Sequence, residues 1–225
     1  MITIICGDDI VKSREALVNL KKVYKEKSYE LIDIDSNSVD DLRKNILERA
    51  SLFSQKRLFF IHGVLSKKGN RDVVHQLDTQ DNPILIWEDK YSDKDIKKNF
   101  PKAKVLVFKL PQTIWKLLDN IYPHNLHTVI LLTRAIIDSV DENMLLYMLQ
   151  KRTKELILVK SNSKHIVKLA PWQITKLSSQ TKKWDMNKLY KFYQKLFEIE
   201  KGTKSGSLPY SIYDALDILF CFYLQ

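Results

Sequence analysis

The hydrophobic positions in the first half of the chain alternate between short continuous runs and helical spacing. Runs such as 2–6 and 84–87 are apolar almost throughout and end near turn residues, which is typical of strands buried on both faces. Between these runs, apolar residues recur every three or four positions, as on the buried face of a helix. The pattern predicts five strands, at 2–6, 29–34, 58–61, 84–87 and 105–108. Helices are predicted between them, the first from a cap at Asp9 or Ser13 to about residue 27 and the others at 38–50, 72–77 and 93–99. We therefore expect a parallel sheet covered by helices on both faces.

After Pro111 the spacing is helical only. Asp141 and Asp185 are expected as N-caps, and Gly202 and Gly206 are expected where a helix ends. The predicted helices are 112–121, 126–138, 141–160, 163–169, 171–183, 185–201 and 209–224. The sequence therefore predicts an α/β domain at 1–110 followed by an all-α domain at 111–225.

Basic residues concentrate in one part of the helical half. The whole chain has 37 Lys and Arg residues against 27 Asp and Glu residues, a formal net charge of +10. Residues 151–204 contain 14 of the basic and 4 of the acidic residues, so this segment accounts for the entire excess. Such a local excess favours an anionic partner, either nucleic acid or an acidic protein face, with a solvated Lys-rich surface as the alternative. The candidate partner-binding residues are Lys182, Lys183, Lys188 and Lys191.

The sheet lacks the motifs of a nucleotide-binding protein. A P-loop needs two glycines five positions apart and then Lys, and no two of the five glycines have this spacing. Where the first strand ends, the sequence Cys6-Gly7-Asp8-Asp9 places two carboxylates where a phosphate would otherwise bind. Asp8 and Asp9 are therefore interpreted as caps of the next helix, and we expect neither a catalytic residue nor a cofactor.

Other reactive side chains are isolated from one another in the sequence. The five histidines form no cluster with cysteines or carboxylates, so no metal site is predicted. Two carboxylate pairs follow strands, where the active sites of such sheets lie, but no nucleophile or base accompanies them. These pairs are Asp33 with Asp35 and Glu88 with Asp89, and the favoured interpretation is that they cap helices or lie in loops.

The two cysteines and the apolar runs indicate in which cellular compartment the protein is expected. Cys6 and Cys221 lie near opposite ends of the chain and are interpreted as small core residues rather than as a disulfide framework. The N-terminus has no basic region of a signal peptide, and the longest apolar run, 218–224, is too short for a membrane span. We expect a cytoplasmic protein with no membrane partner.

Leu52 and Phe53 are large apolar residues within the polar stretch 50–57. Phe53 continues the helical face of Leu42 and Ile46, which favours a core position. Leu52 does not share that face. An exposed Leu-Phe pair at the end of a helix would fit a hydrophobic pocket of a partner, so both interpretations stay open at this point.

Four stretches of the sequence follow a recognisable order. They are Ile4-Ile5-Cys6-Gly7-Asp8-Asp9 followed by Arg14-Glu15-Ala16-Leu17, then Ser51-Leu52-Phe53-Ser54 before Lys56-Arg57, then Thr113-Ile114-Trp115-Lys116-Leu117-Leu118-Asp119, and finally Glu200-Lys201-Gly202-Thr203-Lys204-Ser205-Gly206 before a last apolar helix. With these stretches the chain resembles the delta subunit of bacterial DNA polymerase III, the clamp-opening member of the clamp loader. The match over 112–225, with its acidic-x-x-x-K-x-G signature, is the most specific.

The resemblance implies a function and a set of partners. It implies a non-catalytic subunit with an AAA+-like α/β domain that lacks a P-loop, followed by a helical collar that assembles with ATPase subunits of the gamma or tau type and with a delta-prime-like subunit. Leu52 and Phe53 would bind the sliding clamp (beta), and the complex would act on primed DNA. The alternative function is a stand-alone nucleic-acid-binding protein that uses the basic face 151–204.

One departure from the family is clear in the sequence. Members of the family carry a small lid domain between the α/β domain and the collar. Here only two residues separate Phe108 from Pro111, so the chain resembles a delta subunit without a lid.

Overall fold

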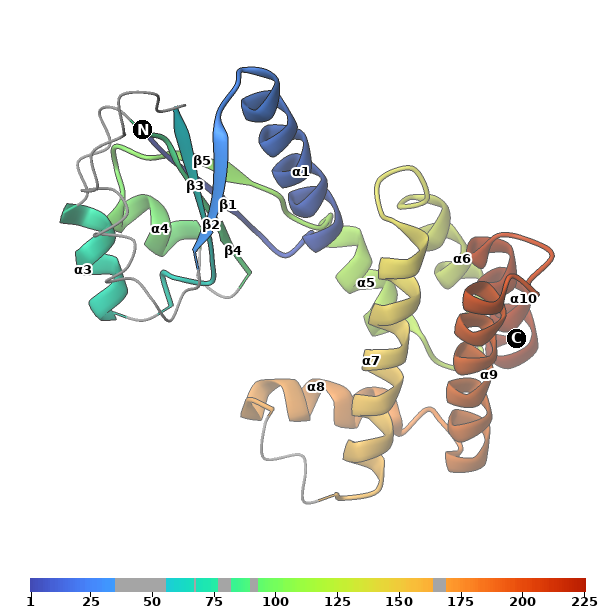
Figure 1. The fold of residues 1–225 in the computed structure, drawn as a ribbon. Helices are drawn as coiled ribbons and strands as arrows, with labels where there is room; N and C mark the ends of the chain where they lie inside the picture. Colours follow the sequence, from blue (N-terminus) through green and yellow to red (C-terminus); the bar gives the residue numbers. More distant parts are fainter. Residues whose placement is uncertain (35–55, 67, 77–81, 90–92, 164–168) are drawn as a thin grey trace. The chain divides into compact units, whose positions relative to one another are not determined.

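The computed structural model describes residues 1–34, 56–66, 68–76, 82–89, 93–163 and 169–225. The chain divides into two compact units, Met1–Leu110 and Pro111–Gln225 (Figure 1). The first unit contains a sheet with helices and the second is helical, which confirms the predicted fold class. The predicted helix 38–50 and most of the predicted helix 163–169 lie outside the described residues.

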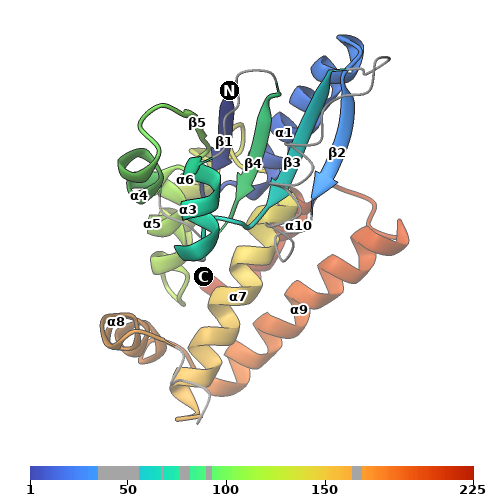
Figure 2. The ribbon, with the colours of Figure 1, turned by 60° about the vertical axis from the view of Figure 1, so that its left-hand side comes forward.

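The sheet of the first unit has five parallel strands in the order β2-β3-β4-β1-β5 (Figure 2). The strands are β1 (Ile2–Cys6), β2 (Glu30–Ile34), β3 (Arg57–His62), β4 (Ile84–Glu88) and β5 (Lys104–Val107). Every strand lies within one residue of its predicted position at each end.

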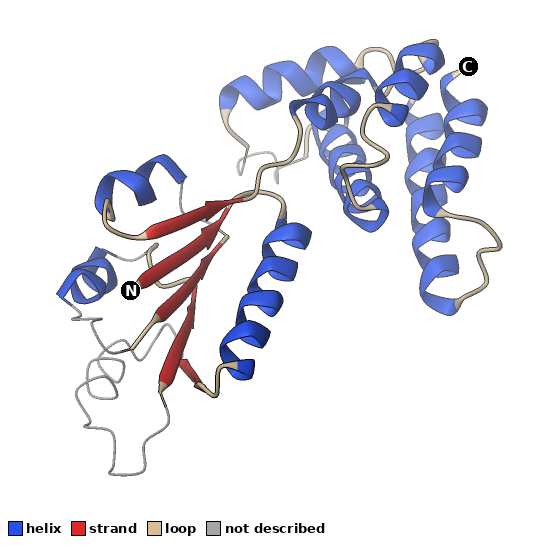
Figure 3. Cartoon of the chain, turned by 90° about the horizontal axis from the view of Figure 1, so that it is seen from above, coloured by secondary structure: helices blue, strands red, loops and turns tan. Residues whose placement is uncertain are grey.

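Helices cover both faces of this sheet (Figure 3). Helix α1 (Ile10–Glu26) lies on one face, and α3 (Lys68–Gln76) and α4 (Asp93–Asn99) lie on the other. Successive side chains of a strand point to opposite faces, so Ile4 joins the core below α4 whereas Ile5 joins Leu17 of α1. The strands carry apolar residues on both faces because each of them contributes to two separate cores.

The second unit consists of helices that pack around a shared apolar core. The described helices are α5 (Gln112–Asn120), α6 (Leu126–Arg134), α7 (Glu142–Lys160), α8 (Pro171–Thr181), α9 (Met186–Ser205) and α10 (Ile212–Leu224). Helix α7 packs against α8 and α9, and α10 packs against α6 and α9 (Figure 1). Phe192 of α9 is fully buried, and its ring lies 5.3 Å from the ring of Trp184.

Several helix ends follow the sequence signals, but the helix predicted at 209–224 begins only at Ile212 and the helix predicted at 126–138 ends at Arg134. Asp141 and Asp185 are N-caps, and their carboxylates accept the amide hydrogens of Met144 and Lys188. Gly206 ends α9 in the left-handed conformation, with φ of 68°. The predicted end near Gly202 is wrong, because α9 continues to Ser205. Within the described residues, no helix is both long enough and apolar enough to cross a bilayer.

Candidate functional site

The turn after β1 is the place where a nucleotide-binding sheet would hold a phosphate. Gly7 has φ of 125°, and a Cβ atom built on it would lie 1.8 Å from the carbonyl oxygen of Phe108. Only glycine is compatible with this backbone and this close approach. Asp9 follows as the N-cap of α1, and its side chain accepts the amide hydrogen of Lys12 at 3.0 Å.

Residues 108–110 occupy this turn. The amide of Asp9 donates to the Phe108 carbonyl at 3.1 Å, and the amide of Phe108 donates to the Cys6 carbonyl at 2.8 Å. The amide of Leu110 donates to the Asp8 carboxylate at 2.8 Å. Asp9 therefore caps the helix as predicted, whereas Asp8 holds the 108–110 segment. The amide of Asp9 and the carboxylates of Asp8 and Asp9 therefore already have hydrogen-bond partners within the protein.

A salt bridge fixes the same segment from α4. The Lys109 ammonium lies 2.8 Å from the Asp93 carboxylate, and this hydrogen bond lowers the pKa of Asp93. Burial raises the pKa of the nearby Cys6 thiol to about 11, so this cysteine is held as the neutral thiol near neutral pH. A neutral thiol is a poor nucleophile, so its buried position fits a structural role.

The interpretation as helix caps or loop residues is wrong for Asp33 and Glu88, which lie within β2 and β4 and make structural contacts there. Asp33 is exposed and forms an ion pair with Lys21 at 2.8 Å, and Asp35 lies outside the described residues. Glu88 is buried and accepts the amide hydrogen of Leu65 at 2.5 Å. Asp89 lies 3.9 Å from the ring of His62, which stacks on Trp87.

Metal-ligating residues are scattered through the described part of the chain. There, no group of three or more His, Cys, Asp and Glu side chains could hold a metal ion. Cys221 is exposed on α10, so its predicted core position is wrong. Apolar residues occupy most positions of α10, so their spacing does not indicate which face of the helix is exposed.

The four candidate lysines lie around the corner between α8 and α9. Lys182 and Lys183 follow the end of α8, and Lys188 and Lys191 lie in the first turns of α9. Lys188 is half-buried and the other three are exposed. The Lys183 ammonium lies 3.5 Å from the centre of the Tyr122 ring, a cation–π contact.

A buried tryptophan fixes this corner. Trp184 is 3% exposed, and its indole N–H donates to the Ile121 carbonyl at 3.0 Å. Backbone hydrogen bonds from the first turn of α9, led by the amide of Lys188, lower the pKa of Asp185. The hydrogen bonds of Trp184 and Asp185 therefore fix the turn that carries the four lysines.

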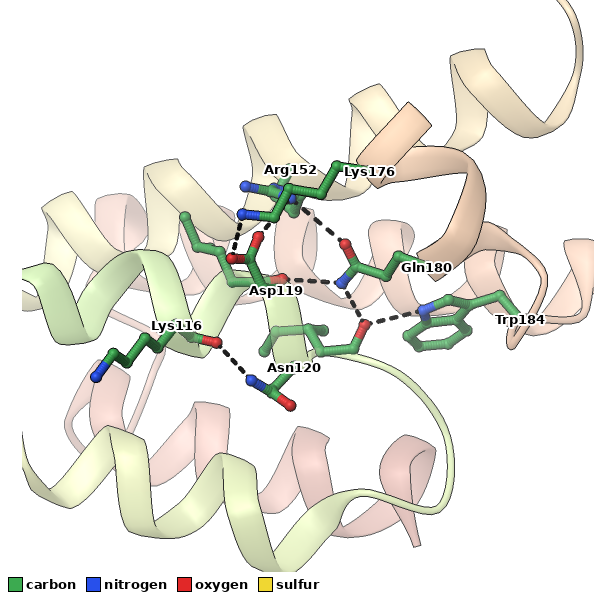
Figure 4. Close-up of polar contacts among 9 residues, drawn as sticks. Lys116, Asp119, Asn120, Arg152, Lys176, Gln180 and Trp184 are labelled. Carbon is green, nitrogen blue, oxygen red and sulfur yellow. Dashed lines mark hydrogen bonds and ion pairs between the residues drawn. The ribbon is translucent and has the colours of Figure 1, made fainter. Parts of the chain in front are cut away.

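A polar network between α5, α7 and α8 was not predicted from the sequence (Figure 4). Asp119 of α5 accepts from Arg152 of α7 at 3.2 Å and from Lys176 of α8 at 2.5 Å. Gln180, 5% exposed, donates to the carbonyls of Leu118 and Ile121. These bonds satisfy carbonyls at the end of α5 that have no partner within the helix. The sequence contained one indication of this network. Gln180 stands three positions after Leu177, where helical spacing predicts an apolar residue.

The C-terminal signature has a structural role in the second unit. Glu200 accepts hydrogen bonds from Lys204 and, at 2.9 Å, from Gln150 of α7, and both bonds lower its pKa. Gly206 then reverses the chain toward α10. The acidic residue of the signature therefore ties α9 to α7, and the final glycine allows the turn into the last helix.

No protein-family model matches the sequence, and a comparison with curated proteins finds no match. Among solved structures, the chain is similar to the Bacillus subtilis DNA clamp loader delta protein, with a TM-score of 0.44 and 9% sequence identity. The similarity covers 99% of this chain and 94% of that one.

Leu52 and Phe53, the predicted clamp-binding residues, lie outside the described residues. The described chain resumes before β3, whose first residue, Arg57, is four positions after Phe53. The assignment of Leu52 and Phe53 stays a prediction, as does the partner of the four lysines.

Proposed function

We propose that this chain is a non-catalytic clamp-loader subunit of the delta type, in which the α/β unit binds a sliding clamp. The observation that carries the proposal is the turn after β1, where residues 108–110 contact Gly7 and hydrogen-bond with Cys6, Asp8 and Asp9. Because the chain's own residues make hydrogen bonds at this turn, the sheet is suited to a structural subunit rather than to one that hydrolyses ATP. The delta-like motifs of the sequence give the kind of complex in which such a subunit works.

The helical unit would assemble with the other loader subunits. Its signature residues Glu200, Lys204 and Gly206 hold α9 against α7 and direct the chain into α10. These contacts support a rigid helical platform, which an assembly domain requires. Its partners would be ATPase subunits of the gamma or tau type and a delta-prime-like subunit, and ATP would act on the ATPase subunits.

Clamp binding would use Leu52 and Phe53. Burial of each side chain in an apolar pocket would contribute ~1.5–3 kcal/mol before the cost of ordering the segment. If this subunit binds the open clamp more tightly than the closed ring, binding shifts the population toward the open form. No catalytic step on this chain is needed for that shift.

The proposal is tested by binding of the full chain to its cognate sliding clamp on a sensor surface. We expect saturable binding that is the same with and without ATP, because the turn after β1 is filled by the chain itself. A chain that is folded by circular dichroism but does not bind the clamp at micromolar concentrations would contradict the proposal.

A further inference from the structure

Two shallow grooves adjoin one another on the helical unit, where α5, α7 and α8 meet. The first has a volume of about 190 Å³ and is lined by Trp115, Arg152 and Trp172 among other residues. The second has a volume of about 200 Å³ and is lined by Tyr122 and Lys183 among other residues. Lys176 lines both grooves, so the two form one continuous feature of the surface.

The first groove presents aromatic surface that the fold does not bury. Trp172, in the first turn of α8, is 67% exposed, and Trp115 of α5 is 37% exposed. Trp184, in contrast, is buried in the same unit and has its N–H satisfied. Tryptophan is usually buried over most of its area, so two indoles that line one open groove call for a binding partner.

The grooves carry a small excess of positive charge in a fixed arrangement. The residues that line them include three cations and two carboxylates. These are Arg152, Lys176 and Lys183 on one side of the balance and Asp119 and Glu155 on the other. Asp119 contacts both Arg152 and Lys176, which holds these long side chains beside the aromatic surface (Figure 4). The Lys183 ammonium lies over the Tyr122 ring, and no carboxylate of the described residues forms an ion pair with it. Its ammonium can therefore bind a phosphate without first leaving an acidic partner.

We propose that these two grooves bind single-stranded nucleic acid. A base stacks on Trp172 in the first groove, and its phosphate lies near Lys176 and Lys183 in the second. Exposed aromatic rings beside cations are the combination by which proteins bind single strands with little sequence preference. An acidic peptide would use the lysines but would leave the indole faces uncovered, and the bases of a duplex are not free to stack on a side chain.

The inference deepens the proposed function, because it gives a loader subunit its own contact with the single-stranded part of primed DNA. It is tested without a clamp and without other subunits. Its failure is therefore distinguishable from a failure of clamp binding.

The first experiment measures binding of a fluorescent oligo(dT) of about 12 nucleotides, a length in the range of known single-strand sites, to the full chain. We expect Trp172→Ala to weaken binding about tenfold and Trp172→Phe to restore most of it, because the phenyl ring can still stack. Phe222→Ala is the matched control, since Phe222 is 78% exposed but lies on α10 outside both grooves. Duplex DNA of the same length should compete poorly.

The second experiment measures the salt dependence of the same binding. Removal of one phosphate contact lowers the slope of log affinity against log salt by about 0.7 for a single strand. We expect this change for Lys183→Ala and no change for Lys201→Ala, which removes the same charge from an exposed position of α9. Wild-type affinity in Trp172→Ala, or absence of oligo(dT) binding by the folded wild-type chain, would overturn the proposal. Equal weakening by Phe222→Ala would also overturn it.

Discussion

Gly7 illustrates how one residue decides what a site can do. Its backbone lies in a region that side chains with a Cβ rarely adopt, and the Phe108 carbonyl occupies the space where a Cβ would lie. The glycine-acidic turn was recognised in the sequence, and Asp9 was correctly predicted as a cap. The contact of Gly7 with Phe108 could not be predicted, because it joins residues about one hundred positions apart.

Gly7→Ala should destabilise the first unit strongly. The strained φ and the clash with Phe108 together should cost about 3 kcal/mol of unfolding free energy. Gly63→Ala is the matched control, because Gly63 also has a positive φ, of 66°, but has open space around the position of a Cβ. It should cost about 1 kcal/mol. Urea denaturation measures both, and equal losses would contradict the role of the Phe108 contact.

Gln180→Ala should destabilise the second unit. The change leaves the Leu118 and Ile121 carbonyls without the amide that binds them, and a buried unsatisfied group costs about 1–3 kcal/mol. Ser179→Ala, one position away and exposed, should change the unfolding free energy by less than about 0.5 kcal/mol. Thermal unfolding of the two variants distinguishes a buried network from a general sensitivity of α8.

At the scale of the elements, apolar spacing located the strands and most helices. The strands were clear because each contributes to two cores and is apolar on both faces. The end of α9 was misplaced because a glycine within a helix resembles a helix end. Gly202 lies inside the helix, where a Cβ would meet the Leu208 Cβ at 3.4 Å, an ordinary contact distance.

The contact of Glu200 between α9 and α7 should make stability depend on pH. Lys204 and Gln150 lower the pKa of Glu200 below its ordinary value of 4.5, so the stabilisation is present above that value and is lost as the pH falls through the folded-state pKa. Because Lys204 is largely exposed, the effect should be only about 0.5 kcal/mol. Glu200→Gln should therefore be less stable than the wild type at pH 7.

The difference between these two proteins should shrink as the pH falls below 4.5. Denaturation curves at a series of pH values measure it. A difference that stays constant from pH 7 to pH 3 would show that the carboxylate charge is not the cause.

At the scale of the whole molecule, the change from alternating runs to helical spacing near residue 110 matches the division into two units. The polar network of Asp119, Arg152 and Gln180 was not foreseen, because its members lie on three helices that meet only in the folded unit. For the same reason the sequence located a basic segment but not the grooves beside it. Spacing reports which face of a helix is buried, but it does not report which side chains of different helices meet.

The chain should not bind ATP, because the Phe108 carbonyl and the two carboxylates occupy the turn that a phosphate would need. Calorimetry of the purified chain with ATP and magnesium should show no binding heat at micromolar concentrations. An ATP-hydrolysing loader subunit serves as the positive control. Micromolar binding of ATP by this chain would refute the assignment of residues 108–110 to the phosphate position.

The central claim is that this chain binds a sliding clamp through Leu52 and Phe53, and the double substitution Leu52→Ala with Phe53→Ala tests it most directly. We expect clamp binding on a sensor surface to fall below detection while the Tm stays within a few degrees of the wild-type value, because exposed side chains contribute little to stability. If these residues belong to the core instead, the same change should cost several kcal/mol and lower the Tm sharply. A folded double variant that binds the clamp with wild-type affinity would contradict the account.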